Sequence, residues 1–198
     1  MLLSGGIEST TLLYEFRHHA LTALFVDYGQ RAARREMLAA RGRCDDLGIR
    51  MTVLDARALG REIGGLRPVR FHVPLPARNL FAMAAGVNWV SAAGGRYLYL
   101  GLNAEDAAHD ASAAPHHVGA LSDLMEALSG VLVAAPYLSL SKAEVVTRGL
   151  GLGVDYGNTY SCLRGRKRHC GRCPQCVARR RAMAHAGAQE ESGFYESS

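Results

Sequence analysis

The chain has 198 residues, 48% of them hydrophobic and 21% charged, a composition typical of a soluble globular protein with one domain, or one domain and a small appendage. Its most apolar region, 80–102, is interrupted by Asn88, Gly94, Gly95 and Arg96 and is a poor membrane span, and no signal peptide is expected because the chain enters its first element at once. The net charge of +5 is concentrated between residues 157 and 189, which contain many arginines and no acid. Such a patch serves an anionic substrate, RNA or a protein partner, or is a solvated face.

The first eleven residues, MLLSGGIESTT, predict a short strand end, a Ser-Gly-Gly turn and a helix from about Glu8 to His18 that Ser4 caps. Unpaired backbone N–H groups and the helix dipole give such a turn partial positive charge, and glycines let an anion approach the backbone closely. The turn is therefore predicted to cradle phosphate. It lacks the spacing of a Walker A loop, and the alternative is an ordinary glycine-rich turn with a Ser or Thr cap.

Strand and helix patterns then alternate to about residue 55. An apolar run over 20–28 predicts a strand buried on both faces. A stretch rich in Ala, Arg and Leu over 30–47 predicts a helix closed by Gly48, and 49–54 predicts the next strand. The order β-α-β-α-β implies a parallel sheet with right-handed crossovers.

From residue 56 on the pattern is less regular. Residues 56–76 hold several glycines and prolines and are expected to form an irregular loop, of a length that is usually functional or mobile. The elements expected beyond it are, in chain order, a buried helix over 77–93, a strand over 97–102, a helix over 116–129, a strand over 131–135 and a helix that Ser141 caps and that runs to about Gly149. The tail after Gly187 is expected to be frayed or disordered.

Ligands of open parallel sheets bind beyond the carboxyl ends of the strands. Four segments that are far apart in the sequence are expected at this one edge, namely 4–9, 27–31, 78–79 and 103–110.

Four cysteines near the C-terminus follow the spacing Cys162-x7-Cys170-x2-Cys173-x2-Cys176. Four thiolates at such intervals suit a closed tetrahedral zinc site, which leaves no open position and is therefore structural. An iron–sulfur cluster is the alternative, and zinc is favoured because the fourth cysteine lies upstream of the C-x2-C-x2-C run. Cys44 is expected to be a buried small hydrophobe and His169 a neighbour of the metal site, not a ligand. This use of cysteine indicates a reducing, cytoplasmic compartment.

Together these motifs resemble the QueC family, the 7-cyano-7-deazaguanine synthases, within the N-type ATP pyrophosphatases. Several segments are weak singly, but the ordered set covers nearly the whole chain and is highly specific. The matching segments are 4–9 (SGGIES, for the family's SGGxDS loop), 27–31 (DYGQR), 76–79 (PARN, for the family's PGRN), Gly101 with Asn103 and Asp106, 141–144 (SKAE), 158–162 (NTYSC), and 170–176 (CGRCPQC) with Arg179.

The resemblance implies a three-layer α/β fold with a parallel sheet, adenine nucleotide α-hydrolase-like and Rossmann-like, and a C-terminal four-cysteine zinc module. The expected division is an ATP-pyrophosphatase domain over 1–156, a zinc-binding segment packed on it over 157–187, and a flexible tail over 188–198. Family members commonly form homodimers.

The chemistry that the resemblance implies begins with ATP, Mg²⁺ and 7-carboxy-7-deazaguanine. The carboxylate is adenylated with release of pyrophosphate, ammonia converts the acyl-adenylate to an amide with release of AMP, and a second activation dehydrates the amide to the nitrile. Cleavage between the α and β phosphates needs stabilisation of a leaving pyrophosphate, for which the backbone of the front loop, Lys142 and Mg²⁺ are suited.

The residue roles follow from the matching motifs. The resemblance implies catalytic roles for Ser4, Glu8, Ser9 and Lys142, contacts to ATP and its phosphates from Leu3, Ser4, Gly5, Gly6, Glu8, Ser9, Thr10, Asp27 and Gly101, and contacts to the deazapurine from Tyr28, Gln30, Arg78, Asn79, Asn103 and Asp106. It assigns zinc to Cys162, Cys170, Cys173 and Cys176.

The sequence also departs from the family pattern. Glu8 stands where the family has Asp, and Ala32 and Arg35 replace a usual His and Glu after DYGQR. The family's YPDCR substrate segment has no counterpart, and residues 109–113 stand roughly at its place. These departures are compatible with ATP chemistry and leave open the substrate, the amine acceptor and the second dehydration.

Three alternatives therefore stand beside the ammonia-dependent ligase. QueC-like proteins of bacterial antiphage CBASS operons suggest transfer of a deazaguanine to a protein amine, such as an N-terminus. The basic C-terminal segment suggests a tRNA-modifying enzyme of the same fold, although tRNA binding is not favoured. The last alternative is a non-catalytic relative that uses the pocket and the zinc module for binding.

Overall fold

The centre of the molecule is a set of parallel strands, which a computed structural model describes together with the rest of residues 1–66 and 73–196. Strand β1 (Thr22–Asp27) pairs with β2 (Arg50–Asp55), and β3 (Tyr97–Tyr99) pairs with β4 (Leu132–Ala134), both in parallel. The first residues of the chain join the two pairs, because Leu2 forms a parallel bridge with Leu24 and its N–H donates to Tyr99 O over 2.9 Å. The predicted parallel sheet is confirmed.

The order of the strands creates a crevice in the middle of the sheet. From one edge to the other the order is β2, β1, the segment 1–3, β3 and β4. Strands β1 and β2 are therefore added on one side of the segment 1–3, and β3 and β4 are added on its other side. In such doubly wound sheets the ligand site lies where the strand order reverses, beyond the carboxyl ends of the strands. Here that point is the turn directly after Leu3.

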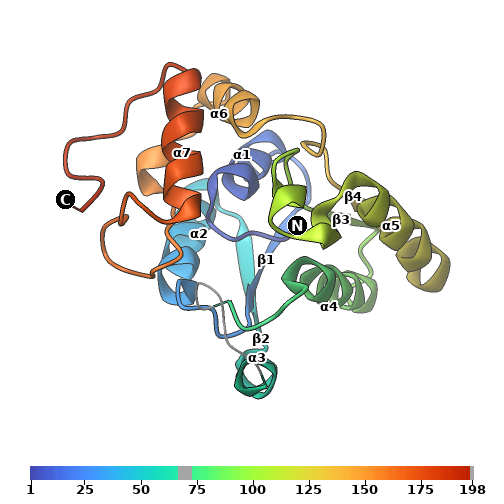
Figure 1. Cartoon of the computed structure of the whole chain (residues 1–198). Coiled ribbons are helices and arrows are strands. Elements are labelled where there is room, and N and C mark those ends of the chain that lie inside the picture. Colours follow the sequence, from blue (N-terminus) through green and yellow to red (C-terminus); the bar gives the residue numbers. More distant parts are fainter. Residues whose placement is uncertain (67–72, 197–198) are drawn as a thin grey trace.

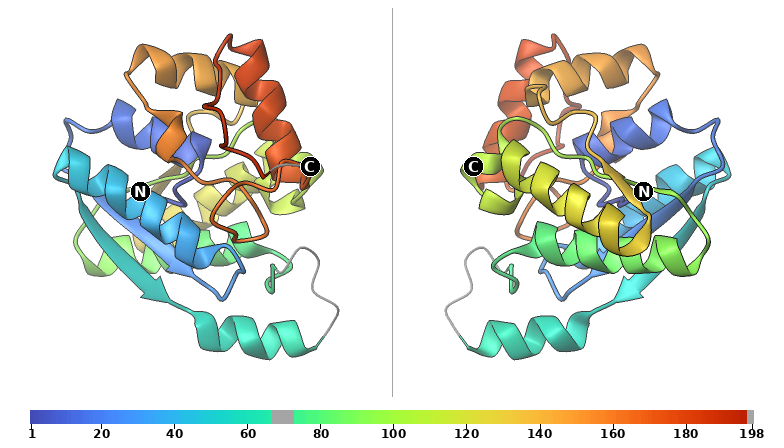
Figure 2. Two further views of the ribbon diagram at one scale, coloured as in Figure 1. Left: turned by 90° about the vertical axis from the view of Figure 1, so that its left-hand side faces the viewer. Right: turned by 90° about the vertical axis from the view of Figure 1, so that its right-hand side faces the viewer.

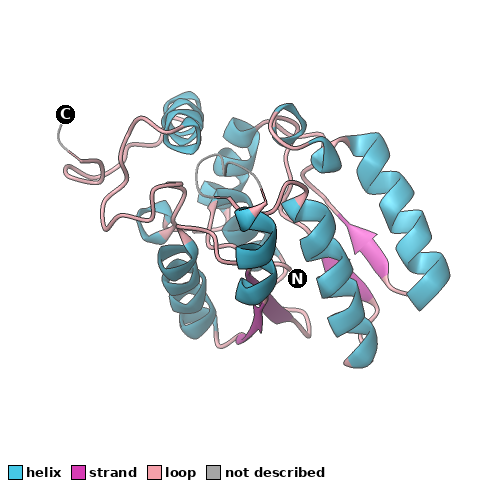
Figure 3. Cartoon of the chain, turned by 60° about the horizontal axis from the view of Figure 1, so that its bottom comes forward, coloured by secondary structure: helices cyan, strands magenta, loops and turns pink. Residues whose placement is uncertain are grey.

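Helices lie around the strands and complete the three-layer fold (Figures 1 and 3). The helices are α1 (Ile7–Glu15), α2 (Ala33–Leu47), α3 (Arg57–Gly65), α4 (Arg78–Ala92), α5 (Pro115–Ser129), α6 (Lys142–Gly151) and α7 (Pro174–His185), with short 3-10 turns at Asp106–Ala108, Ala111–Ala113 and Tyr156–Asn158. In Figure 1, α2 and α4 lie on opposite sides of β1. Helix α6 packs against both α1 and α7, and α4 packs against α5 and β3.

The two larger of three apolar clusters pack against the central strands, and the third surrounds the four cysteines. Residues 23–26 of β1 are buried without interruption, which agrees with the prediction of a strand covered on both faces. The first cluster joins α1 to α6 and contains Leu12, Leu13 and Val145, and the second joins α4 to β3 and contains Met83 and Leu98. Packing against α6 therefore holds α1 in place, and with it the turn that precedes α1.

The structure differs from the sequence predictions in several elements. Residues 57–65 were expected to be irregular but form α3. This helix follows β2 and lies at the bottom of both views of Figure 2. Residues 67–72 of the same expected loop lie outside the described residues. Helix α7, within the cysteine segment, was not predicted. Ser4 does not cap α1, since Gly6 is the N-cap residue and no side chain caps it.

The C-terminal residues 188–196 lie against the cysteine segment, a contact that the expectation of a flexible tail did not include. Tyr195 forms a parallel bridge with His169, and Phe194 stacks on the His169 ring with centroids 4.3 Å apart. Arg166 pairs with Glu196 over 2.9 Å. In the described part of the chain, no helix combines the length and apolar character needed to span a membrane.

Candidate active site and metal centre

The turn between Leu3 and α1 forms a loop with a forced backbone conformation. Gly5 has φ +75°, and a Cβ atom at this position would lie 2.5 Å from the carbonyl oxygen of Glu36, so only glycine fits. The hydroxyls of Ser4 and Ser9 lie 3.1 Å apart across the loop. Because no side chain caps α1, its first N–H groups and the positive end of its dipole face the space above the loop. This is the geometry of an anion site.

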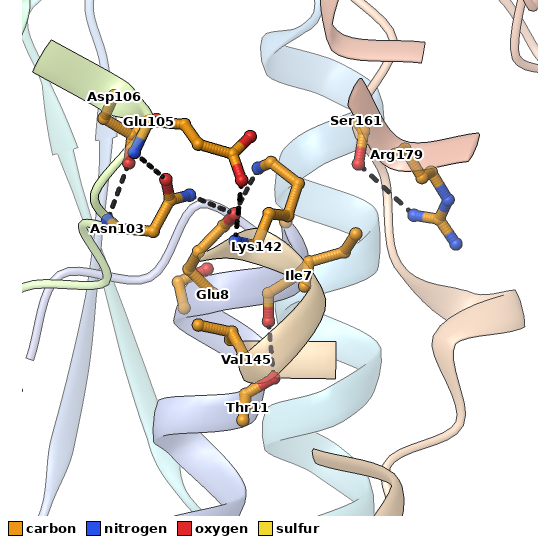
Figure 4. Close-up of polar contacts among 12 residues, drawn as sticks. Ile7, Glu8, Thr11, Asn103, Glu105, Asp106, Lys142, Val145, Ser161 and Arg179 are labelled. Carbon is orange, nitrogen blue, oxygen red and sulfur yellow. Dashed lines mark hydrogen bonds and ion pairs between the residues drawn. The ribbon is translucent and has the colours of Figure 1, made fainter. Parts of the chain in front are cut away.

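Glu8, in the first turn of α1, is paired with Lys142, the first residue of α6 (Figure 4). Lys142 Nζ donates to Glu8 Oε1, and Asn103 Nδ2 donates to the same oxygen over 2.7 Å. Burial alone would raise the pKa of Glu8, but the charge of Lys142 outweighs it and the pKa lies below its usual value. Burial opposes the charge on Lys142 in the same way, and the carboxylates of Glu8 and Asp106 hold its pKa above its usual value. Both groups are therefore charged at neutral pH.

A polar loop after β3 positions this pair. Asp106 Oδ2 accepts from the N–H of Asn103 over 2.9 Å, and Asn103 Oδ1 accepts from the N–H of Glu105 over 2.8 Å. Glu105 Oε1 in turn accepts from the N–H of Lys142 over 3.0 Å. Burial and the neighbouring Glu8 carboxylate raise the pKa of Asp106. The start of α6 is thus tied to the loop after β3.

The predicted cap of α6 is confirmed and fixes the helix that carries Lys142. Ser141 Oγ accepts from the N–H of Glu144 over 3.3 Å, and Glu144 Oε2 accepts from the N–H of Ser141 over 2.7 Å. The two bonds form a capping box.

A cavity of about 500 Å³ lies over the loop at the carboxyl ends of the strands. Most residues that the sequence singled out for ATP, substrate or catalysis line it, namely Leu3, Ser4, Gly6, Glu8, Ser9, Tyr28, Gln30, Arg78, Asn79, Gly101, Asp106 and Lys142. Gly5, Thr10, Asp27 and Asn103 are not on its wall. Thr10 and Asn103 are fully buried, and Asp27 Oδ1 accepts from the N–H of Gly29 over 3.0 Å. Asn103 therefore acts on Glu8 and not on the cavity.

Sequence reasoning missed Glu36, which also lines the cavity. The family comparison placed Arg35 where a glutamate is usual, but Glu36, one residue later, carries its carboxylate to the cavity. Gln30 Nε2 donates to Glu36 Oε2 over 3.0 Å, and Gln30 Oε1 accepts from the N–H of Tyr28 over 3.1 Å. Burial raises the pKa of Glu36 to about 7. Burial and the Glu36 carboxylate also raise the pKa of Tyr28.

Arg78, at the start of α4, faces the buried carboxylate of Asp110, which the sequence placed at this edge within residues 103–110 without a role of its own. Asp110 Oδ2 lies 3.6 Å from Arg78 Nη1 and has no hydrogen-bond partner in the described part of the chain. The other oxygen of Asp110 accepts from the N–H of Ser112 over 3.0 Å. Asp110 therefore places a negative charge behind Arg78, at roughly the position where the family has its YPDCR segment.

The cysteine segment contributes to the same cavity. The N–H of Tyr160 donates to Gly5 O over 2.8 Å, which ties the segment to the loop. Leu163, Pro174 and Gln175 line the cavity beside it. Pro174 and Gln175 belong to the matching segment 170–176, but sequence reasoning assigned neither of them nor Leu163 a role in the cavity.

Four cysteines converge at the base of α7. The Sγ atoms of Cys162, Cys170, Cys173 and Cys176 all lie within 4.8 Å of one another, and all four side chains are buried. Backbone N–H groups of Cys170 and Cys173 point at Cys162 Sγ and Cys170 Sγ over 3.4 and 3.3 Å. Four sulfurs this close fit one ion with bonds of about 2.3 Å. His169 Nε2 accepts instead from the N–H of Ser161 over 3.0 Å, and Cys44 lies alone in the core, as predicted.

Arg179 joins the cysteine segment to the tail. Its side chain is 1% exposed, and its guanidinium donates to Thr159 Oγ1 over 2.7 Å and to Tyr156 O over 2.7 Å. It also donates to Ser161 Oγ over 3.2 Å (Figure 4). Its Nε atom is paired with Glu190. The family motif pointed to Arg179, and the structure shows it as an internal crosslink.

The family model described as queuosine biosynthesis protein QueC matches residues 1–66 and 68–187. A 7-cyano-7-deazaguanine synthase of Methanothermobacter thermautotrophicus is 32% identical over 98% of this chain and 98% of its own length. The synthase of an Azoarcus species is 34% identical over 98% of this chain and 95% of its own length.

Solved structures are similar at the level of the fold. The NMN synthetase of Francisella tularensis has a TM-score of 0.56 and 14% identity, covering 96% of this chain and 77% of its own. The U34-tRNA thiolase NcsA of Methanococcus maripaludis, solved with its [4Fe-4S] cluster, has a TM-score of 0.54 and 19% identity, covering 93% of this chain and 63% of its own.

Proposed function

This chain belongs to the QueC family, and on that premise we propose that it is an ATP-dependent ligase that joins the carboxylate of 7-carboxy-7-deazaguanine to an amine. The observation that carries the proposal is the anion-binding loop at one end of a cavity of about 500 Å³ whose other end is polar. ATP bound by its phosphates at the loop would leave the part of the cavity along Tyr28 and Arg78 for the deazapurine. The two ligands of the reaction then meet in one cavity.

The first step is adenylation. A carboxylate oxygen of the substrate attacks the α-phosphorus of ATP, the bond from that phosphorus to the bridging oxygen breaks, and pyrophosphate leaves. The first N–H groups of α1 and the hydroxyls of Ser4 and Ser9 face the leaving charge, and Lys142 adds an ammonium beside it. Magnesium that accompanies ATP neutralises phosphate charge, and the carboxylates of Glu8 and Asp106 are the oxygen ligands on this wall that would hold it.

The second step forms the new bond. The amine attacks the carbonyl carbon of the acyl-adenylate, the carbon–oxygen bond to AMP breaks, and a proton leaves the nitrogen. With ammonia the product is the amide, and a second activation with loss of the amide oxygen gives the nitrile. Apolar wall residues such as Met83 and Leu163 keep water from the acyl-adenylate.

A macromolecular amine is the second candidate acceptor, and one observation favours it. A second hollow of about 410 Å³ shares Tyr160 with the first cavity and is lined by Arg35, Arg43, Lys167 and Arg168. A basic hollow next to the cavity suits an acidic chain that carries its amine to the acyl-adenylate.

The test is product analysis. Mixing the protein with ATP, Mg²⁺, 7-carboxy-7-deazaguanine and ammonium is expected to release AMP and pyrophosphate and to give the amide or nitrile by mass spectrometry. Release of ADP alone, or no turnover with any amine, overturns the ligase. A deazaguanine conjugate on a co-purified macromolecule, with no amide or nitrile from ammonium, identifies the second acceptor.

For the cysteine centre we propose structural zinc. Four buried thiolates within 4.8 Å leave no open position, and they pin the Tyr160 segment against the loop. A cluster of several irons needs a wider cage of sulfurs than a single ion does. Elemental analysis is expected to find about one zinc per chain. Iron with acid-labile sulfide and a visible absorption band would establish the iron–sulfur alternative.

A further inference from the structure

Glu36 is a carboxylate on the cavity wall to which no motif gives a role. It lies in the first turns of α2, and its backbone abuts Gly5 of the phosphate-binding loop. Its side chain lines the cavity together with Tyr28 and Arg78. Glu36 therefore stands at the meeting point of the phosphate end and the base end of the cavity.

Gln30 fixes the direction of this carboxylate. Because Gln30 Oε1 accepts from the N–H of Tyr28, its amino end is the one that faces Glu36 Oε2. The same amino group donates to Val26 O over 3.3 Å. All the polar atoms of Gln30 are thus used within the protein, so Gln30 holds Glu36 in place. Gln30 also lines the cavity, so the substrate contact expected of it stays a prediction beside this role.

The second oxygen of Glu36 is left for a ligand. In the described residues Glu36 Oε1 has no hydrogen-bond partner, and no Lys or Arg nitrogen lies within 4 Å of the carboxylate. Glu36 is half-buried, and a carboxylate that is partly removed from water with one hydrogen-bond donor and no cation is costly. A ligand that brings N–H donors to this wall would satisfy it.

The donors that fit are those of a guanine-type base. On such a base a ring N–H and an exocyclic amino group lie side by side, and the two acceptor oxygens of a carboxylate match them. Glu36 Oε1 is unpaired in the described residues, and Oε2 can accept a second bond beside the one from Gln30 because each carboxylate oxygen has two lone pairs. The corresponding edge of adenine pairs one donor with one acceptor, and that acceptor repels a carboxylate. We propose that Glu36 is a specificity-determining residue that accepts hydrogen bonds from the ring N–H and the 2-amino group of 7-deazaguanine. The proposal rests on the proposed function for the nature of the base.

Binding of the base alone tests this role without any turnover. The probes are 7-deazaguanine and 7-deazahypoxanthine, which lacks the 2-amino group, measured by calorimetry on the wild-type chain and on Glu36→Gln. Glutamine has nearly the same shape as glutamate, but it supplies only one acceptor oxygen, and its amide N–H groups would face the N–H donors of the base. We expect a loss of about 10- to 100-fold in affinity for 7-deazaguanine and a smaller loss for 7-deazahypoxanthine, so that the preference between the two shrinks. ATP affinity is expected to stay unchanged.

Asp45→Asn is the matched control, because it removes the same charge from an exposed position on the same helix. Equal binding of 7-deazaguanine to Glu36→Gln and to the wild type overturns the proposal, and so does a wild type that does not prefer 7-deazaguanine over 7-deazahypoxanthine. A fall in turnover of Glu36→Gln with unchanged affinity also overturns it, because Glu36 would then be a proton acceptor. Pyrophosphate release decides the ligase separately. If the wild type turns over and Glu36→Gln binds the base with unaltered affinity, only the proposed role of Glu36 is contradicted. If Glu36→Gln loses affinity as expected but the wild type shows no turnover, only the proposed ligase activity is contradicted.

Discussion

Glu8 and Lys142 lie 134 positions apart in the sequence and form an ion pair whose side chains are only 12% and 8% exposed. The pair connects the first turn of α1, next to the Ser-Gly-Gly loop, with the first residue of α6. Asn103 supports it from a third segment. Glu8 stands where the family has a shorter Asp, so its longer arm spans the distance to Lys142 here.

Lys142→Met is expected to abolish pyrophosphate release and to lower stability. Removing one partner of a buried pair leaves an uncompensated charge, which costs about 3–5 kcal/mol. The double variant Glu8→Gln with Lys142→Met removes both charges and should regain most of that stability while staying inactive. Urea denaturation and a pyrophosphate assay measure the two effects. A single variant as stable as the wild type would mean that Glu8 is well solvated in the native state.

Gly101→Ala is expected to displace the first turn of α1 and with it the Ser-Gly-Gly loop. A Cβ atom at this position would lie 2.7 Å from the backbone nitrogen of Ser9, within the first turn of α1. The overpacking should cost about 1–3 kcal/mol and reduce pyrophosphate release. Gly119→Ala is the control, since a Cβ there meets nothing within 4 Å and helix propensity predicts a gain of up to about 1 kcal/mol. Full activity in Gly101→Ala would show that the loop tolerates displacement.

Local sequence determined much of the fold. The buried strand at 22–27 and the glycine-closed helix α2 follow from patterns within their own residues. Helix α3 was missed because its nine residues include three glycines, which weaken helix propensity. One of them, Gly60, is explained only by tertiary packing, because a Cβ there would lie 1.8 Å from Tyr28 O. Helix α7 did carry a signal, Pro174 at its first position.

The site was predictable where a motif names a residue and less so where backbone geometry decides. The loop serines and Lys142 lie on the cavity, as the motifs implied. Glu36 was missed because two tight turns lead into α2. In these turns the N–H of Ala33 donates to Gln30 O over 3.0 Å, and the N–H of Arg35 donates to Ala32 O over 2.8 Å. Such 3-10 turns rotate the helix relative to a count along the sequence. Therefore residue 36 and not residue 35 reaches the cavity.

Glu190→Ala is expected to destabilise the chain although it lies in the tail. Arg179 is 1% exposed, and the variant removes the only carboxylate paired with it in the described residues. The loss should be about 3 kcal/mol, since a buried guanidinium is left without its counter-charge. Glu191→Ala is the matched control because Glu191 is exposed. Equal unfolding midpoints in urea for the two variants would show that the pair of Arg179 with Glu190 contributes nothing to stability.

Glu36→Gln is expected to stabilise the unliganded protein, and increasingly so as pH rises. Burial raises the pKa of Glu36 to about 7 in the folded chain, above the usual 4.5, although Gln30 and Arg78 oppose the shift and Asp27 adds to it. The folded state therefore binds more protons than the unfolded state between about pH 4.5 and 7, and wild-type stability falls over that window.

Glutamine does not ionise, so the stability difference between Glu36→Gln and wild type should grow from pH 5 to pH 7 and then level off. Urea denaturation at several pH values measures it, with Asp45→Asn as the control for removing a charge from an exposed position on the same helix. A difference that is constant from pH 5 to 8 would mean that Glu36 ionises in the folded chain as it does in the unfolded one. Added 7-deazaguanine is expected to reduce the advantage of Glu36→Gln, because its donors favour the ionised carboxylate of the wild type. A residue that lowers the stability of the empty protein and is satisfied by ligand fits a role in recognition and not in folding.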